Sequence, residues 1–155
     1  MNNNRPFSPE EFKEIFSRVT RLCVELVIKT PQGIILSLRN LPTWNSMWHL
    51  PGGMVFYRET VTDAIERVAK DELGIDITIH KLLGYNEYPS EEKERGFGWS
   101  VGLMFLCSSK VIDIRPNNNE ASEIKMFNEL PPSLIEEHKT FLQSKWDEIQ
   151  NLDVH

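Results

Sequence analysis

The chain has 155 residues, of which 40% are hydrophobic and 26% charged, a balance typical of a globular protein with one full core. A formal net charge of -6, with a pI near 5.3, argues against broad binding to nucleic acid or to an anionic membrane surface. No apolar run approaches the roughly 18 residues of a membrane-spanning helix, and the N-terminus lacks an apolar signal core, so we expect a cytoplasmic protein without nucleic-acid or membrane partners.

Helical and strand-like patterns alternate irregularly along the chain. Ser8 and Thr60 are N-cap candidates, and Gly74 is the expected end of the second helix. The predicted elements are a helix at 8–19, strands at 20–30 and 33–40, a loop at 41–47, a short extended piece at 48–50, a glycine-led loop at 51–59, a helix at 60–73, a strand at 76–88, a charged mobile loop at 90–96, strands at 97–109 and 123–128, and a helix at 131–149. This order predicts an α/β (α+β) fold, a single domain over 1–155 with a mixed sheet between helices.

The segment 51–75 carries the clearest chemical signal in the chain. Two glycines, Gly52 and Gly53, let the backbone approach a ligand because no Cβ blocks it. The helix that follows carries the adjacent carboxylates Asp71 and Glu72. Hard cations such as Mg²⁺ take oxygen ligands, often one or two carboxylates completed by waters and substrate phosphates. The alternative is a solvated helix surface whose charges pair at i,i+4 spacing.

The spacing favours a ligand site, because the segment resembles the Nudix box: Gly, five residues, Glu, seven residues, then Arg-Glu-aliphatic-any-Glu-Glu-any-Gly-aliphatic. The matching positions are Gly53, Glu59, Arg67, Glu72, Gly74 and Ile75, with Asp71 at a Glu position. The resemblance implies a Nudix α/β/α sandwich with the box at 53–75. It also implies a hydrolase, with Mg²⁺ or Mn²⁺ as cofactor, that acts on a nucleoside diphosphate linked to another moiety. Dimers are common in the family, so we expect a homodimer by analogy.

The resemblance also implies roles for individual residues. The Gly52 carbonyl, Asp71 and Glu72 are the expected metal ligands. Arg67 and Glu59 are expected to organise the loop and helix, and with Glu72 they form the expected catalytic set. One departure is Val68, which stands where the box has a Glu that often binds metal or acts as a base. A site with fewer carboxylates predicts fewer metal ions, and it leaves the general base unassigned.

Outside the box, the chain is similar to the GDP-mannose mannosyl hydrolase branch of the family. By this resemblance Glu25 and Arg39 are expected substrate-binding residues, and a nucleotide-sugar such as GDP-mannose is the expected substrate. Two positions depart from that branch: Met54 stands where it has an Arg, and the segment 97–108 lacks its catalytic His. Two functions therefore stay open, an enzyme and a catalytically weak module that binds or senses a nucleotide or nucleotide-sugar.

Several other residues are candidates whose structural role is the simpler interpretation. His49 lies next to the two glycines and could reach a ligand, although a structural role is simpler. Glu91, Glu92 and Glu94 could supply a ligand or base, but we expect them in a solvated loop. Glu120 or Glu123 could face the site, and an aromatic ring could stack on a nucleobase. The aromatic candidates are Trp44, Trp48, Tyr57 and Trp99. We expect His80, His138 and His155 at surface or strand positions, and Cys23 and Cys107 as buried thiols.

Overall fold

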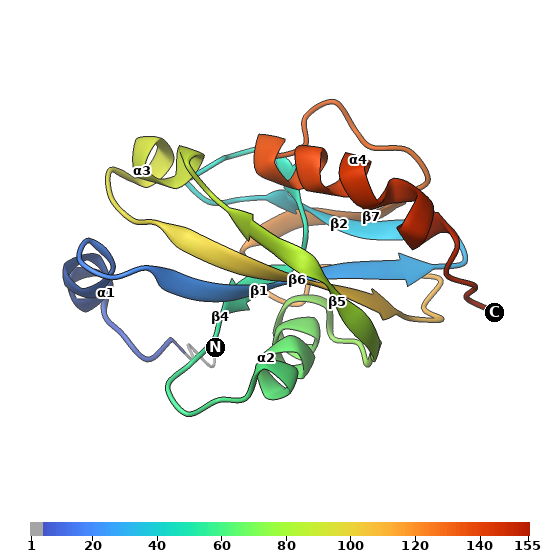
Figure 1. Cartoon of the computed structure of the whole chain (residues 1–155), viewed down its shortest axis with the longest axis horizontal. Coiled ribbons are helices and arrows are strands. Elements are labelled where there is room, and N and C mark those ends of the chain that lie inside the picture. The colour runs from blue at the N-terminus through green and yellow to red at the C-terminus, as the bar shows by residue number, and fades with distance from the viewer. Residues whose placement is uncertain (1–4) are drawn as a thin grey trace.

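A mixed seven-stranded sheet lies between helices in the computed structural model, which describes residues 5–155 (Figure 1). The strands are β1 (Arg21–Thr30), β2 (Gly33–Arg39), β3 (Trp48–His49), β4 (Gly52–Met54), β5 (Thr78–Glu87), β6 (Ser100–Ser108) and β7 (Ala121–Phe127). Their main order is β3-β2-β1-β6-β5, with β4 paired to β1 and β7 to β2. Only β1 and β6 run parallel among these pairs, so the predicted mixed sheet of a Nudix α/β/α sandwich is confirmed.

The helices cover the two faces and one end of the sheet, and α2 and α4 lie on opposite faces (Figure 1). The helices are α1 (Pro9–Phe16), α2 (Val61–Val68), which continues as the π-helical turn η1 (Ala69–Leu73), α3 (Ser90–Arg95) and α4 (Glu136–Gln150). Alternation along β1 sends Leu26 into the core beneath α2, whereas Val27 packs with Leu142 of α4. Two apolar layers therefore enclose the sheet.

The strand β1 has different neighbours along its length, and this opens a site in the sheet. It pairs with β6 from Arg21 to Lys29, but with β2 only at Lys29 and Thr30. Its first half pairs instead with β4, where Glu25 lies opposite Gly52. Because β2 and β4 part from each other along one edge of β1, Glu25 lies at the point where these strands diverge.

Local sequence explains where α2 begins and η1 ends. The hydroxyl of Thr60 accepts a hydrogen bond from the Asp63 amide at 3.1 Å, as expected of an N-cap. Gly74 ends the helix with a left-handed φ of 67°, which glycine adopts without steric cost. The predicted extent of this helix, 60–73, is thus close to the observed one. Its last turn is π-helical, a feature that the apolar periodicity did not reveal and that is frequent at functional sites.

Three expectations are wrong at the C-terminal side of the fold. The segment 90–96 forms the short helix α3 rather than a mobile loop, and Glu91 in it is 1% exposed. The last helix begins at Glu136 rather than at 131, because residues 132–133 form a turn and the backbone of Ser133 and Ile135 is hydrogen-bonded to Trp48 instead. His138 is buried in the first turn of that helix, where we expected a surface or strand position.

Candidate functional site

An ion pair holds the loop and helix of the box together. The Arg67 Nε donates to Glu59 Oε1 at 2.6 Å, and Arg67 Nη2 donates to the Met54 carbonyl at 2.8 Å. The guanidinium also lies 3.8 Å from the centre of the Phe56 ring. These hydrogen bonds from Arg67 hold the pKa of Glu59 below its usual value. The two residues expected to organise this segment are therefore in contact, in a geometry that fixes the loop 54–59 on α2.

Replacing Arg67 by Met should lower the free energy of unfolding by about 2–3 kcal/mol, because Glu59 and the Met54 carbonyl lose their charged donor. Urea denaturation of the metal-free protein measures this. Lys70→Met is the control, since Lys70 pairs with the exposed Asp76 and should cost less than about 0.5 kcal/mol. Equal losses in the two variants would mean that the box ion pair is no more than a surface contact.

The π-helical turn sends the adjacent carboxylates Asp71 and Glu72 to different surroundings. The Asp71 side chain is 46% exposed, with Oδ2 3.9 Å from Arg67 Nη1. Glu72 is directed toward β4, where its carboxylate accepts a hydrogen bond from the Gly52 amide. Two of the three predicted metal ligands, Gly52 and Glu72, are thus brought together, while Asp71 lies at the outer side of the turn.

The charges of three carboxylates and one guanidinium act on one another near Gly52. Burial raises the pKa of Glu72, and the charges of Glu120 and Glu25 raise it further, while the Gly52 amide and Arg39 oppose this effect. Burial likewise raises the pKa of Glu25 to about 8. Like charges that destabilise one another in a partly desolvated space form an arrangement that a cation would relieve.

The residue set fits a divalent cation by its chemistry. A backbone carbonyl with one or two carboxylates is a sufficient protein contribution for Mg²⁺, which keeps waters and substrate oxygens as its other ligands. Over residues 5–155, no three His, Cys, Asp or Glu side chains are already gathered at metal-binding distance. A site built by Gly52, Glu72 and one neighbouring carboxylate therefore agrees better with the chain than a cage made only of protein side chains.

Arg39 is held in place beside these carboxylates by its own loop. Its Nε donates to the Thr43 carbonyl and its Nη2 to the Thr43 hydroxyl, both at 2.8 Å. The Trp44 ring lies 5.5 Å from the guanidinium carbon. The backbone amide of Trp44 donates to the Glu94 carboxylate, and its indole N–H donates to the Ser90 hydroxyl of α3. These hydrogen bonds fix the loop 41–47 against α3. A fixed guanidinium next to several carboxylates is well suited to a phosphate group if a cation offsets their charge.

Of the two acidic candidates flanking the last strand, Glu120 is the one whose charge acts on the site residues. Its charge acts on both Glu72 and Arg39, and its side chain also pairs with Arg5. Glu120 lies in a polar loop more than 40 positions after the box, so no spacing rule connects it to Glu72. The neighbouring Asn117 fixes this loop on η1, since its backbone N–H donates to the Glu72 backbone carbonyl at 3.0 Å.

The remaining candidates lie elsewhere or have structural roles. Glu123 pairs with Lys125 at 2.8 Å, and Glu91 is buried against Arg21 at 2.8 Å. Trp48 packs in the core against Phe127, as the structural interpretation predicts. Other positions are exposed, namely Tyr57 at 91% and Trp99 at 39%. Cys23 and Cys107 are buried as predicted, and burial raises the pKa of each thiol to about 12.

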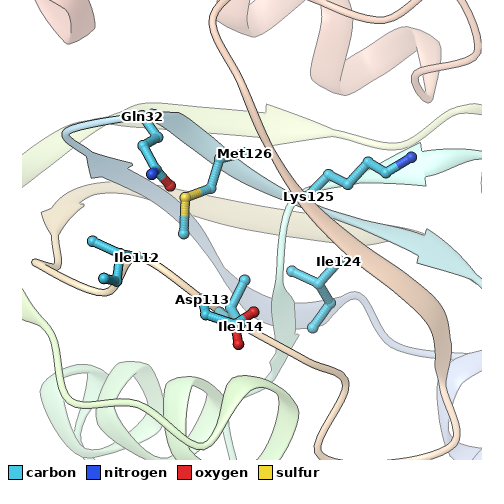
Figure 2. Close-up of a pocket in the computed structure, with 7 residues that line it drawn as sticks. All are labelled: Gln32, Ile112, Asp113, Ile114, Ile124, Lys125 and Met126. Carbon is cyan, nitrogen blue, oxygen red and sulfur yellow. The ribbon is translucent and has the colours of Figure 1, made fainter.

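A shallow surface hollow of about 280 Å³ is separate from this site (Figure 2). It is lined by Gln32, Ile112, Asp113, Ile114, Ile124, Lys125 and Met126. None of the residues around Gly52 contributes to it, and it brings together only one acidic and one basic side chain. The candidate site is therefore the one at β4 and η1, where the sequence motif lies, and not this hollow.

The comparison with known families decides the classification. The model of the NUDIX domain matches residues 19–145. The chain belongs to this family. The match includes the box, the strands β1, β2 and β4, and most of α4. It confirms the predicted family and agrees with an enzyme of the Nudix hydrolase class. Within residues 5–155, we find no helix whose length and apolar character would let it cross a bilayer.

Individual relatives of this Nudix chain show where the similarity is strongest. It is 42% identical over 79 residues to the low-salt glycan biosynthesis protein Agl8 of Haloferax volcanii, and the match spans 51% of each chain. It is 26% identical over 120 residues to an ADP-ribose pyrophosphatase of Methanocaldococcus jannaschii, spanning 76% of this chain and 69% of that one. The crystal structure of a MutT protein from Methanosarcina mazei Go1 has a TM-score of 0.70 at 19% identity, covering 86% and 96% of the two chains, which shows the shared fold.

Proposed function

We propose that this Nudix chain is a hydrolase that uses Mg²⁺ or Mn²⁺ to cleave a nucleoside diphosphate linked to a sugar. The observation that carries the proposal is the position of Glu25 opposite Gly52 in the box loop, together with the mutual influence of the charges of Glu72, Glu120 and Arg39. The names of two relatives concern ADP-ribose and glycan biosynthesis, and ADP-ribose is itself a diphosphate that joins a nucleoside to a sugar. A nucleotide-sugar substrate, with GDP-mannose as one example, is consistent with the names of both relatives.

In this proposal each side chain has a distinct role. Glu72 and the Gly52 carbonyl bind the cation, with Glu120 as the nearby second carboxylate. Asp71 stays a predicted ligand that would have to turn away from Arg67. The cation would neutralise the diphosphate and stabilise the departing oxygen. Arg39 binds a phosphate oxygen through its planar donors, Glu25 binds the substrate, and Arg67 with Glu59 keeps the loop and helix in place for catalysis.

A substrate panel tests this function. Nucleoside diphosphates, triphosphates and nucleotide-sugars are incubated with Mg²⁺ or Mn²⁺ in ¹⁸O-labelled water, and the products are analysed by mass spectrometry. We expect release of a nucleotide from at least one nucleotide-sugar, and loss of that activity on chelation. The position of the label distinguishes attack at carbon from attack at phosphorus. Turnover that continues in excess chelator would contradict the metal requirement.

One observation favours a second function, a module that binds a nucleotide without efficient hydrolysis. Val68 occupies the position at which the box has a Glu, and the structure buries it in the core at 2% exposure, 3.2 Å from a Cβ built at Gly53. No carboxylate is therefore available from this position. Thermal stabilisation by a nucleotide-sugar without turnover in the panel would support this alternative. The cytoplasmic location and the homodimer also stay predictions, and light scattering after gel filtration tests the dimer.

A further inference from the structure

Two buried polar side chains outside the box connect α4 and β5 to the site. Tyr88, 6% exposed, follows the end of β5, and His138, 3% exposed, lies in the first turn of α4. The Leu50 amide donates to His138 Nδ1 at 3.1 Å, and His138 Nε2 lies 2.9 Å from the Tyr88 hydroxyl. The Tyr88 hydroxyl lies next to Glu25, since both border the space above Gly102, and hydrogen bonding by Tyr88 lowers the pKa of Glu25. A continuous chain of hydrogen bonds thus runs from the backbone two residues before Gly52 to the Glu25 carboxylate.

The Leu50 amide fixes the direction of this chain. Because an N–H donates to His138 Nδ1, that nitrogen has no proton, and the neutral ring carries its proton on Nε2. Burial, together with the charges of His49 and Arg39, lowers the pKa of His138 to about 3, so the ring stays neutral near pH 7. Nε2–H therefore donates to the Tyr88 oxygen. The Tyr88 hydroxyl proton is left for a Glu25 oxygen, which is a stronger acceptor than Met104 Sδ at 4.0 Å.

Two glycines leave Glu25 and Tyr88 very little freedom. A Cβ at Gly52 would collide with the Glu25 carboxylate. A Cβ at Gly102 would lie 3.0 Å from Glu25 Cγ and 3.1 Å from the Tyr88 hydroxyl. The Glu25 side chain thus occupies the space that the missing side chains of β4 and β6 provide. It remains 13% exposed, which leaves part of the carboxylate accessible from the site.

We propose that Tyr88 and His138 are positioning residues that hold the Glu25 carboxylate in one orientation toward the substrate. They act through Glu25 and touch no substrate themselves. The inference rests on the proposed function for the role of Glu25, whereas the hydrogen-bond chain is a property of the protein without substrate. In this proposal the C-terminal helix α4, through His138, helps to orient the Glu25 side chain.

A double-mutant cycle tests the proposal. Tyr88→Phe removes one hydroxyl and keeps the ring, so kcat/KM should fall about tenfold, as expected when a carboxylate loses a hydrogen-bond donor. In a Glu25→Gln background, Tyr88→Phe should lower kcat/KM less than about twofold, because Tyr88 then has no carboxylate to orient. Tyr85→Phe is the matched control, since Tyr85 is in β5 and is 67% exposed. Losses in Tyr88→Phe that were independent of Glu25 would overturn the proposal.

Nuclear magnetic resonance without substrate gives a second readout. Labelled histidine should show His138 as the Nε2–H tautomer, and the carboxylate carbon of Glu25 should shift in Tyr88→Phe but not in Tyr85→Phe. A proton on Nδ1 of His138, or an unchanged Glu25 signal, would contradict the positioning role. If no substrate in the panel were cleaved, the proposed function would fail, yet these spectra would still decide whether the chain orients Glu25.

Discussion

Replacing Glu72 by Gln should lower divalent-dependent turnover of the best substrate by about 1,000-fold, because the metal interaction is worth several kcal/mol in the transition state. Glu72 is the carboxylate that accepts the Gly52 hydrogen bond and faces Glu25, Glu120 and Arg39. Gln keeps the shape but removes the charge that a cation needs. Steady-state kinetics at saturating Mn²⁺, with Mn²⁺ affinity measured by electron paramagnetic resonance, distinguish lost binding of metal from lost catalysis.

Asp71→Asn is the informative comparison for this prediction. The Asp71 side chain is 46% exposed and lies 3.9 Å from Arg67, on the outer side of the π-helical turn. We expect its replacement to cost no more than about tenfold, through weaker orientation of the neighbouring residues. If Asp71→Asn lost as much Mn²⁺ affinity as Glu72→Gln, both carboxylates would bind the cation directly. If Glu72→Gln retained full turnover, the metal assignment would be wrong.

The metal-free protein should be most stable between about pH 4.5 and 6.5 and lose stability on both sides of this range. Burial raises the pKa of Glu25 from 4.5 to about 8, so the folded state retains a proton that the unfolded state releases. Stability therefore falls as pH rises from about 4.5 to 8. Burial shifts Glu72 in the same direction. The loss from Glu25 alone is on the order of 4 kcal/mol at about pH 8.

The histidines produce the opposite slope in acid. Burial lowers the pKa of His49 and of His138 from 6.5 to about 3, so the unfolded state binds protons that the folded state does not. Stability is therefore lost as pH falls from about 6.5 toward 3. Between about 4.5 and 6.5 the two effects oppose each other, and the free energy of unfolding changes little with pH.

Urea denaturation in chelator at several pH values measures this profile. Glu25→Gln should reduce the loss on the alkaline side and make the protein more stable than the parent at about pH 8. Glu66→Gln, at an exposed position of α2, is the matched control and should leave the profile unchanged. A parent protein that became more stable between about pH 5 and 8 would show that Glu25 is not buried as the fold places it.

The hydrogen-bond network around Glu25 shows why part of the site could not be inferred from the sequence. His138 and Tyr88 are 113 and 63 positions away from Glu25, and no spacing rule connects them. Their contact depends on α4 packing across the face of the sheet that contains Val27 and Met104. Glu91 is a similar case, because an isolated run of charges predicts a solvated loop. It becomes buried since Arg21 and Ser100 supply partners from distant strands.

The amino-acid sequence by itself determined the family, the mixed sheet between helices, the helix that follows Gly53 and the ion pair of Arg67 with Glu59. These features depend on short-range patterns: apolar periodicity, capping residues, glycines at turns and fixed spacing within one segment of about 23 residues. The family resemblance had named Glu25 and Arg39, but only the tertiary structure decided that their charges and that of Glu120 act on Glu72, while Asp71 faces outward. The physical reason is that two features direct these side chains, the parting of β2 from β4 along one edge of β1 and the π-helical turn, and both result from long-range packing.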